Sequence, residues 1–206
     1  MEFKTDQEKF WAGEFGNAYI NRNKGSHLLA SNLNFFTKAL HPIGTLKSCI
    51  EFGANIGMNL RALELLYPNI SLSGLEINKE AYNKLKEITG IENAYHMSIF
   101  DYTPKKNYDL SFIKGVLIHI NPEMLTKVYD QLYNSSKKYI LIAEYYNPTP
   151  VSISYRGHND RLFKRDFAGE FLDRFVNTSL VDYGFAYHRD KAFPQDDISW
   201  FLIEKN

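Results

Sequence analysis

The chain has 206 residues, of which 44% are hydrophobic and 15% aromatic. This size and apolar content suit one globular domain with a sizeable core, so residues 1–206 are interpreted as a single domain. The 24 Lys and Arg residues balance the 24 Asp and Glu residues. A neutral chain shows no sign of a nucleic-acid partner, which would need clustered positive charge.

The sequence also predicts where the protein works. No apolar run reaches the ~20 residues that span a bilayer, and the charged first residues lack the apolar core of a signal peptide. Cys49 is the only cysteine, which excludes an internal disulfide and fits a reducing compartment. We therefore expect a cytoplasmic protein that does not bind membranes. The six histidines show no ligand-like pairing, so no metal is expected.

The first forty residues are expected to be helical. Apolar residues at spacings of three and four predict helices over residues 6–22 and 28–40, and the second should end at His41-Pro42. We interpret residues 1–42 as a helical cap, or lid, on the rest of the domain.

From residue 43 onward, strand-like and helical segments alternate. Strands are expected at residues 46–52, 70–77, 94–99, 108–114 and 139–145, and helices at residues 58–66, 79–88 and 122–133. Short connections between such elements predict right-handed crossovers and a parallel sheet covered by helices on both faces.

The alternation of strands and helices ends after the fifth strand. Residues 147–164 are rich in Pro and polar residues and are predicted to form a long loop near the acceptor, followed by a helix over 165–175. The strand-like runs 180–188 and 198–203 have no helix between them, which predicts an antiparallel hairpin. Residues 43–206 are thus expected to form a Rossmann-like α/β core whose mostly parallel, seven-stranded sheet ends in this hairpin. Such a sheet is typical of methyltransferases.

A glycine-rich turn follows the first strand and opens a helix. Its sequence runs Glu-Phe-Gly-Ala-Asn-Ile-Gly from Glu51 to Gly57. A dinucleotide fingerprint would place glycines where Asn55 and Met58 stand, so an NAD-dependent enzyme is disfavoured. The spacing fits the acidic-x-Gly-x-Gly-x-Gly form of methyltransferases, with Gly53 as its first glycine. It predicts S-adenosylmethionine as cofactor, with Glu51 near its positively charged amino acid end.

Two further segments are assigned to the cofactor. Glu76 closes the second strand 19 residues after Gly57, where a carboxylate can accept both ribose hydroxyls. After the third strand, Ile99 and Phe100 are expected to sandwich the adenine. Asp101 is left with two interpretations, as the acceptor for the adenine amine or as a solvent-exposed or capping residue.

Several segments resemble one family of class I S-adenosylmethionine-dependent enzymes, the pseudaminic-acid-biosynthesis-associated methyltransferases. The glycine turn is generic, whereas residues 114–123, 155–158 and 161–170 are more specific, and the similarity runs from about Trp11 to the C-terminal residue. The resemblance implies an acceptor related to a nonulosonic acid that decorates bacterial surface structures, and no metal. Lys114, at the start of one of these segments, is assigned to the cofactor site.

Methylation of a sugar hydroxyl calls for a base that helps remove the proton. His119 follows the fourth strand and His158 lies in the loop after the fifth. Both are candidate catalytic residues. The alternative for His119 is a packed residue at the start of the next helix, and for His158 an ordinary loop residue.

The acceptor itself is expected to be an anionic sugar. Arg156 or Arg161 would bind its carboxylate or phosphate through a planar guanidinium fork, although a run of basic residues is more often a solvated face. Tyr145 and Tyr146 would line the sugar pocket, and Arg22 of the lid would meet a carboxylate on cofactor or substrate. Two other functions stay open, a methyltransferase for another small anionic acceptor and a non-catalytic cofactor-binding accessory of glycan assembly. The methylated atom and the oligomeric state also stay open.

Overall fold

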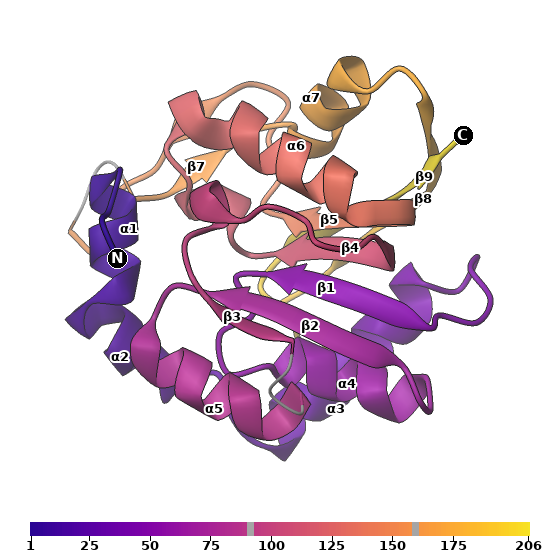
Figure 1. Cartoon of the computed structure of the whole chain (residues 1–206), viewed down its shortest axis with the longest axis horizontal. Helices are drawn as coiled ribbons and strands as arrows, with labels where there is room; N and C mark the ends of the chain where they lie inside the picture. Colours follow the sequence, from indigo (N-terminus) through magenta and orange to yellow (C-terminus); the bar gives the residue numbers. More distant parts are fainter. Residues whose placement is uncertain (90–92, 158–160) are drawn as a thin grey trace.

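The computed structural model describes residues 1–89, 93–157 and 161–206. Seven strands form one sheet in the order β3-β2-β1-β4-β5-β9-β8 (Figure 1). The strands are β1 (Ser48–Phe52), β2 (Ser71–Glu76), β3 (Ala94–His96), β4 (Tyr108–Lys114), β5 (Ser136–Glu144), β8 (Thr178–Ala186) and β9 (Ile198–Lys205). β1 to β5 pair in parallel, whereas β9 is antiparallel to both β5 and β8. The predicted mostly parallel sheet with a C-terminal antiparallel hairpin is confirmed.

Helices cover both faces of this sheet (Figure 1). On one face lie α3 (Ser26–Ala39), α4 (Met58–Leu66) and α5 (Lys79–Thr89), and on the other lie α6 (Leu125–Ser135) and α7 (Phe167–Arg174). Each face has its own hydrophobic core, and β1 contributes to both because successive strand residues point to opposite faces. Cys49 belongs to the core under α3 and α4, whereas Ile50 and Phe52 belong to the core under α6 and α7.

The helix predicted over residues 6–22 is wrong in part, because two helices occupy this segment. α1 (Asp6–Ala12) and α2 (Glu14–Ile20) are separated at Gly13, whose backbone is extended. Glycine costs ~1 kcal/mol relative to alanine inside a helix, so a break there is cheap. The predicted loop 147–164 also differs from the structure, since it contains a short antiparallel pair formed by β6 (Val151–Ser152) and β7 (Phe163–Lys164).

The lid formed by α1 and α2 lies beside the carboxyl ends of the parallel strands (Figure 1). Asn78, two residues after β2, holds it there. Its Nδ2 donates to the Asn17 side-chain oxygen at 2.7 Å and to the Trp11 carbonyl at 3.2 Å. α2 comes so close that a Cβ on Gly16 would lie 2.8 Å from Asn78 Nδ2. The lid is therefore docked on the core directly after the end of β2.

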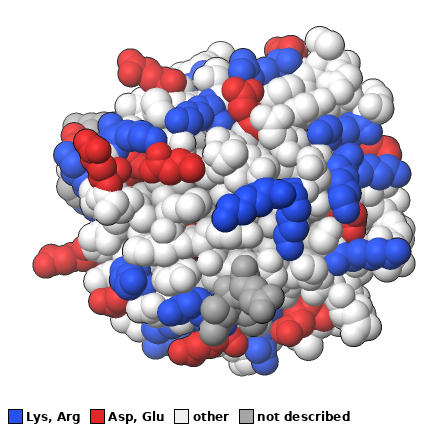
Figure 2. Space-filling view, in the orientation of Figure 1, with Lys and Arg blue, Asp and Glu red and all other residues white. Residues whose placement is uncertain are grey.

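The surface carries charges of both signs. On the face drawn in Figure 2, Lys and Arg side chains are interspersed with Asp and Glu side chains. Exposed ion pairs such as Arg174–Asp130 contribute only ~0–1 kcal/mol each. Within the described ranges, no helix combines the length and apolar composition that crossing a bilayer requires.

Gly74 of β2 is closely packed against its neighbours. An added Cβ would lie 2.9 Å from the Ala54 Cβ and 3.1 Å from the Leu60 Cδ1. Gly74→Ala should therefore lower the free energy of unfolding by about 1–3 kcal/mol in urea denaturation, because the core is overpacked. Gly44→Ala is the matched control, since nothing lies within 4 Å of its added Cβ. Equal losses in the two variants would contradict this packing.

Candidate functional site

A cavity of about 590 Å³ lies at the carboxyl edge of the parallel strands, a size typical of small-molecule sites. The lid, the turn after β1, the ends of β2 and β4 and the loop between β8 and β9 form its wall. Ten predicted site residues line it: Arg22, Gly53, Asn55, Glu76, Ile99, Phe100, Lys114, His119, Tyr145 and Arg156. Glu51, Gly57, Tyr146 and Arg161 are not part of this lining, and His158 lies outside the described residues.

Two residues of the turn after β1, Gly53 and Asn55, have positive φ angles. Gly53 has φ +77°, and a Cβ there would lie 2.6 Å from a methyl carbon of Val116, so only glycine fits. The amides of Gly53 and Ala54 donate to the Leu75 carbonyl at 3.0 and 2.8 Å, which ties the turn to β2. Asn55 also has a positive φ of 48°, a conformation that Asn tolerates better than most residues. This explains how Asn occupies the middle glycine position of the motif.

Glu76 fixes this turn from the end of β2. The carboxylate is 8% exposed. Its Oε2 accepts from the Asn55 amide and its Oε1 from the Asn78 amide, both at 2.7 Å. Burial raises the pKa of Glu76, and these backbone donors oppose the shift. Each oxygen keeps a second lone pair, so a diol could still donate to this carboxylate.

Glu51 lies behind the cavity wall. It is 1% exposed, and its Oε1 accepts from Asn59 Nδ2 at 2.6 Å. Burial raises the pKa of Glu51 to about 8, despite this bond and the nearby charge of Lys114. The side chain is therefore mostly protonated at pH 7. Asn59, which sequence reasoning missed, lines the cavity in front of it.

Lys114, at the end of β4, gives the cavity wall a cationic group. Its ammonium lies 5.3 Å from the centroid of the Phe35 ring. Burial lowers the pKa of Lys114, and the charges of Glu51, Asp196 and Glu144 oppose this shift.

Glu144 organises the turn that leads to His119. This last residue of β5 is 3% exposed and accepts from the amides of Val116 at 2.9 Å and Leu117 at 2.8 Å. Burial raises its pKa to about 7. Sequence reasoning missed this residue, although an acidic residue closing a buried strand is the same signal that identified Glu76.

His119 is packed into the cavity wall with one ring nitrogen free of a proton. It is 9% exposed, and its ring lies 4.5 Å from the Trp11 ring and 5.3 Å from the Tyr155 ring. Its Nδ1 is 2.6 Å from the Arg161 carbonyl oxygen. A carbonyl can only accept, so Nδ1 carries the proton and Nε2 carries the lone pair. Burial lowers the pKa of His119 to about 4, which keeps the ring neutral at physiological pH.

Two arginines of the lining lie on aromatic rings. The Arg22 guanidinium is 5.6 Å from the Tyr19 ring centroid, and that of Arg156 is 5.6 Å from the Tyr155 ring centroid. Tyr145 lines the same cavity, and burial raises the pKa of its phenol well above the usual range. Cationic and phenolic groups therefore line the same cavity.

Two residues predicted to bind the acceptor lie elsewhere. Tyr146 is 43% exposed, with its ring 6.1 Å from the ring of Phe201. The Arg161 guanidinium lies 5.5 Å from the Phe10 ring centroid, and its backbone carbonyl is the partner of His119. Arg161 does not line the cavity itself, but its backbone carbonyl contacts the lining residue His119.

The structure adds residues that no sequence motif marked. Gln195 and Asp196, from the loop between β8 and β9, line the cavity, and Gln195 Nε2 donates to Asn32 Oδ1 at 3.0 Å. Three polar atoms of lining residues are buried without a hydrogen-bond partner among the described residues. They are Glu8 Oε1, Trp11 Nε1 and Asn55 Oδ1.

Unsatisfied buried polar atoms cost ~1–3 kcal/mol each, so the cavity suits a ligand that has both donors and acceptors. Across the described ranges, no three His, Cys, Asp or Glu side chains converge as a metal ion would require.

The amino-acid sequence matches no protein-family model and no curated protein sequence. The fold, in contrast, is shared with solved methyltransferases. Magnesium protoporphyrin IX methyltransferase from Synechocystis PCC 6803, solved with bound S-adenosylmethionine, has a TM-score of 0.69 and 10% identity, with 100% of each chain covered.

Two other solved structures are similar to the same extent. A 1,6-didemethyltoxoflavin-N1-methyltransferase from Burkholderia thailandensis, with bound S-adenosylhomocysteine, has a TM-score of 0.68 and 15% identity over 97% of this chain and 87% of that one. The mitomycin 7-O-methyltransferase MmcR has a TM-score of 0.67 and 12% identity over 98% of this chain and 61% of that one. The chain therefore has the Rossmann-like fold of S-adenosylmethionine-dependent methyltransferases.

The buried carboxyl group of Glu51 makes stability depend on pH. Its pKa of about 8 exceeds the ordinary value near 4.5, so the folded protein holds a proton that the unfolded chain releases between these values. The stability from this proton is present at low pH and is lost as pH rises toward 8. Glu51→Gln should therefore gain stability over the wild type by on the order of 1 kcal/mol per pH unit between pH 5 and 8, measured by chemical denaturation.

The exposed Glu64 of α4 provides the control. Glu64→Gln should track the wild type across the same pH range. A constant difference between Glu51→Gln and the wild type would contradict the raised pKa.

Proposed function

We propose that this protein is an S-adenosylmethionine-dependent methyltransferase whose acceptor is a nonulosonic acid of the pseudaminic type or its nucleotide-activated form. One observation carries the proposal: a single cavity joins the glycine turn and Glu76 to His119 and two arginines. The shared fold supports the reaction class, since neighbours of this fold were solved with S-adenosylmethionine or S-adenosylhomocysteine.

The lining residues fit such a cofactor. Glu76 can accept from ribose hydroxyls, Ile99 and Phe100 offer apolar contact to a base, and Lys114 can pair with a carboxylate. The buried Asn55 Oδ1 still needs a donor, as a polar ligand would provide. When bound, S-adenosylmethionine supplies a methyl group already activated by its sulfonium charge.

The other lining groups favour a small, anionic and hydroxylated acceptor. Arg22 and Arg156 offer planar forks that bind carboxylate or phosphate, and Tyr145 offers a phenol to a sugar hydroxyl. The even mixture of charges on the face in Figure 2 favours such an acceptor over a nucleic acid.

His119 is the base in this proposal. Its Nε2 would take the proton of the acceptor hydroxyl as that oxygen attacks the activated methyl group. The imidazolium formed in this buried place keeps its Nδ1–H bond to the Arg161 carbonyl, which strengthens when the ring is charged. The residue therefore works from a fixed orientation.

A two-part experiment tests the function. Calorimetric titration with S-adenosylhomocysteine is followed by transfer of a labelled methyl group to free and nucleotide-activated pseudaminic acid. We expect binding and label in one of the two acceptors. Binding with transfer only to other small anions would replace the acceptor, and binding without any transfer would favour a non-catalytic accessory. No binding would refute the proposal.

Replacing His119 with an aromatic residue that cannot accept a proton separates its role as base from its role in packing. His119→Phe preserves packing against Trp11 and should lower kcat by ~10²–10⁴-fold, with S-adenosylhomocysteine affinity unchanged. In the wild type, kcat/KM should not respond to this group between pH 8 and 5, because a pKa of about 4 keeps it neutral there. An acid limb near pH 6.5 that vanishes in His119→Phe would contradict the buried neutral ring.

A further inference from the structure

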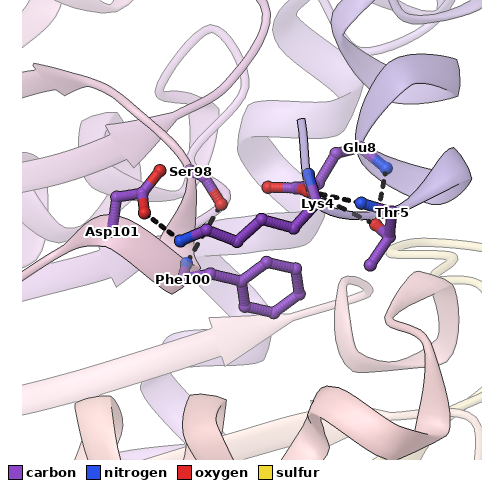
Figure 3. A network of polar contacts seen from close by, with 6 residues as sticks. All are labelled: Lys4, Thr5, Glu8, Ser98, Phe100 and Asp101. Atoms are coloured by element: carbon purple, nitrogen blue, oxygen red, sulfur yellow. Dashed lines mark hydrogen bonds and ion pairs between the residues drawn. The ribbon is translucent and has the colours of Figure 1, made fainter. Parts of the chain in front are cut away.

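Asp101 does not line the cavity, which argues against the adenine role that one interpretation of the sequence gave it. Its carboxylate instead forms an ion pair with the Lys4 ammonium (Figure 3). This pair joins the residues before α1 to the 3₁₀ turn at Ile99–Asp101. The adenine amine therefore needs another acceptor on this part of the wall.

Glu8, in the first turn of α1, has a carboxylate oxygen to offer. The residue is 7% exposed and lines the cavity. Its Oε2 accepts from the amides of Lys4 at 2.6 Å and Thr5 at 2.9 Å, which completes the capping box of α1. Its Oε1 is buried and has no partner among the described residues. One oxygen thus holds the helix, and the other is left for a donor.

The surroundings of Glu8 are those expected of an adenine site. Ser98, Ile99 and Phe100 line the same cavity, and the Ser98 hydroxyl oxygen accepts from the Phe100 amide at 3.0 Å. In Figure 3, the Lys4 side chain connects the Glu8 turn to this segment. An apolar wall beside one carboxylate oxygen suits a flat base that carries an N–H donor.

We propose that Glu8 Oε1 accepts a hydrogen bond from the exocyclic amine of the cofactor's adenine. This inference rests on the proposed function and names a residue of the lid, rather than the carboxylate after the third strand, as the group that recognises the base. Because Glu8 belongs to the lid, recognition of adenine and closure of the cavity depend on the same side chain.

Two ligands that differ only in their purine ring distinguish recognition of adenine from binding of the rest of the cofactor. S-inosylhomocysteine has a carbonyl oxygen in place of the exocyclic amine and an N–H in place of the lone pair on the adjacent ring nitrogen. The group that would face Glu8 Oε1 is therefore an acceptor. Glu8→Gln keeps one oxygen for the capping box, which accommodates Gln as well as Glu, and places an amide donor in the cavity. The substitution should therefore reverse the preference without unfolding α1.

Calorimetric titration of the full chain with both ligands tests this role. We expect the wild type to bind S-adenosylhomocysteine at least ~10-fold more tightly than the inosyl analogue. Glu8→Gln should lose about 10–100-fold in affinity for S-adenosylhomocysteine and bind the analogue as well or better. Asp101→Asn, which breaks only the ion pair with Lys4, should keep the wild-type ratio.

A capping control distinguishes recognition from lid stability. Thr5→Ala removes the hydroxyl that accepts from the Glu8 amide and leaves Glu8 Oε1 in place, so it should weaken both ligands equally. An equal loss for both ligands in Glu8→Gln would overturn the inference, as would a collapse of the ratio in Asp101→Asn. A wild type that binds neither ligand would overturn the proposed function together with this inference. If the wild type binds but the ratio of the two affinities is unchanged in Glu8→Gln, only the role of Glu8 is overturned and the proposed function stands.

Discussion

The cavity depends on two buried carboxylates that accept hydrogen bonds from backbone amides of turns after neighbouring strands. Glu76 of β2 holds the amide of Asn55 after β1, and Glu144 of β5 holds those of Val116 and Leu117 after β4. A carboxylate is buried at tolerable cost only when such donors surround it. Each of these turns is thus held by the strand beside it. This part of the cavity therefore takes shape only when β2 lies next to β1 and β5 next to β4.

Hydrogen bonds and ring contacts connect the lid to the residues that these carboxylates hold. Asn78, whose own amide donates to Glu76, also donates to the Trp11 carbonyl, and Trp11 packs on His119. His119 in turn donates to the Arg161 carbonyl, two residues before β7. The lid, the end of β2 and the segment before β7 are therefore linked through one chain of contacts. The docked lid covers His119, which is 9% exposed, and charge interactions are stronger where water is excluded.

The fold was predictable because buried parallel strands are continuous apolar runs separated by short signals, and the Glu76 and Asn55 positions followed from local spacing. The predictions that failed, and the residues that were missed, depend on side-chain orientation or on contacts between residues far apart in the sequence. Tyr145 lines the cavity and Tyr146 does not, because successive residues of an extended chain face opposite ways. Trp11 and Glu8 reach the site only through docking of the lid, which rests on contacts such as Asn78–Trp11 across 67 residues. No local pattern encodes such a contact.

The distribution of charge connects the two proposals. The lining contains three carboxylates and three cationic side chains among the described residues, namely Glu8, Glu76 and Asp196 with Arg22, Lys114 and Arg156. Glu8 and Glu76 each accept two backbone N–H bonds and, in these proposals, also hold the base and the ribose. These lining charges balance one another, and bound S-adenosylmethionine, with its sulfonium, ammonium and carboxylate, adds a net positive charge. An anionic acceptor balances this excess, so cofactor and acceptor should each favour binding of the other.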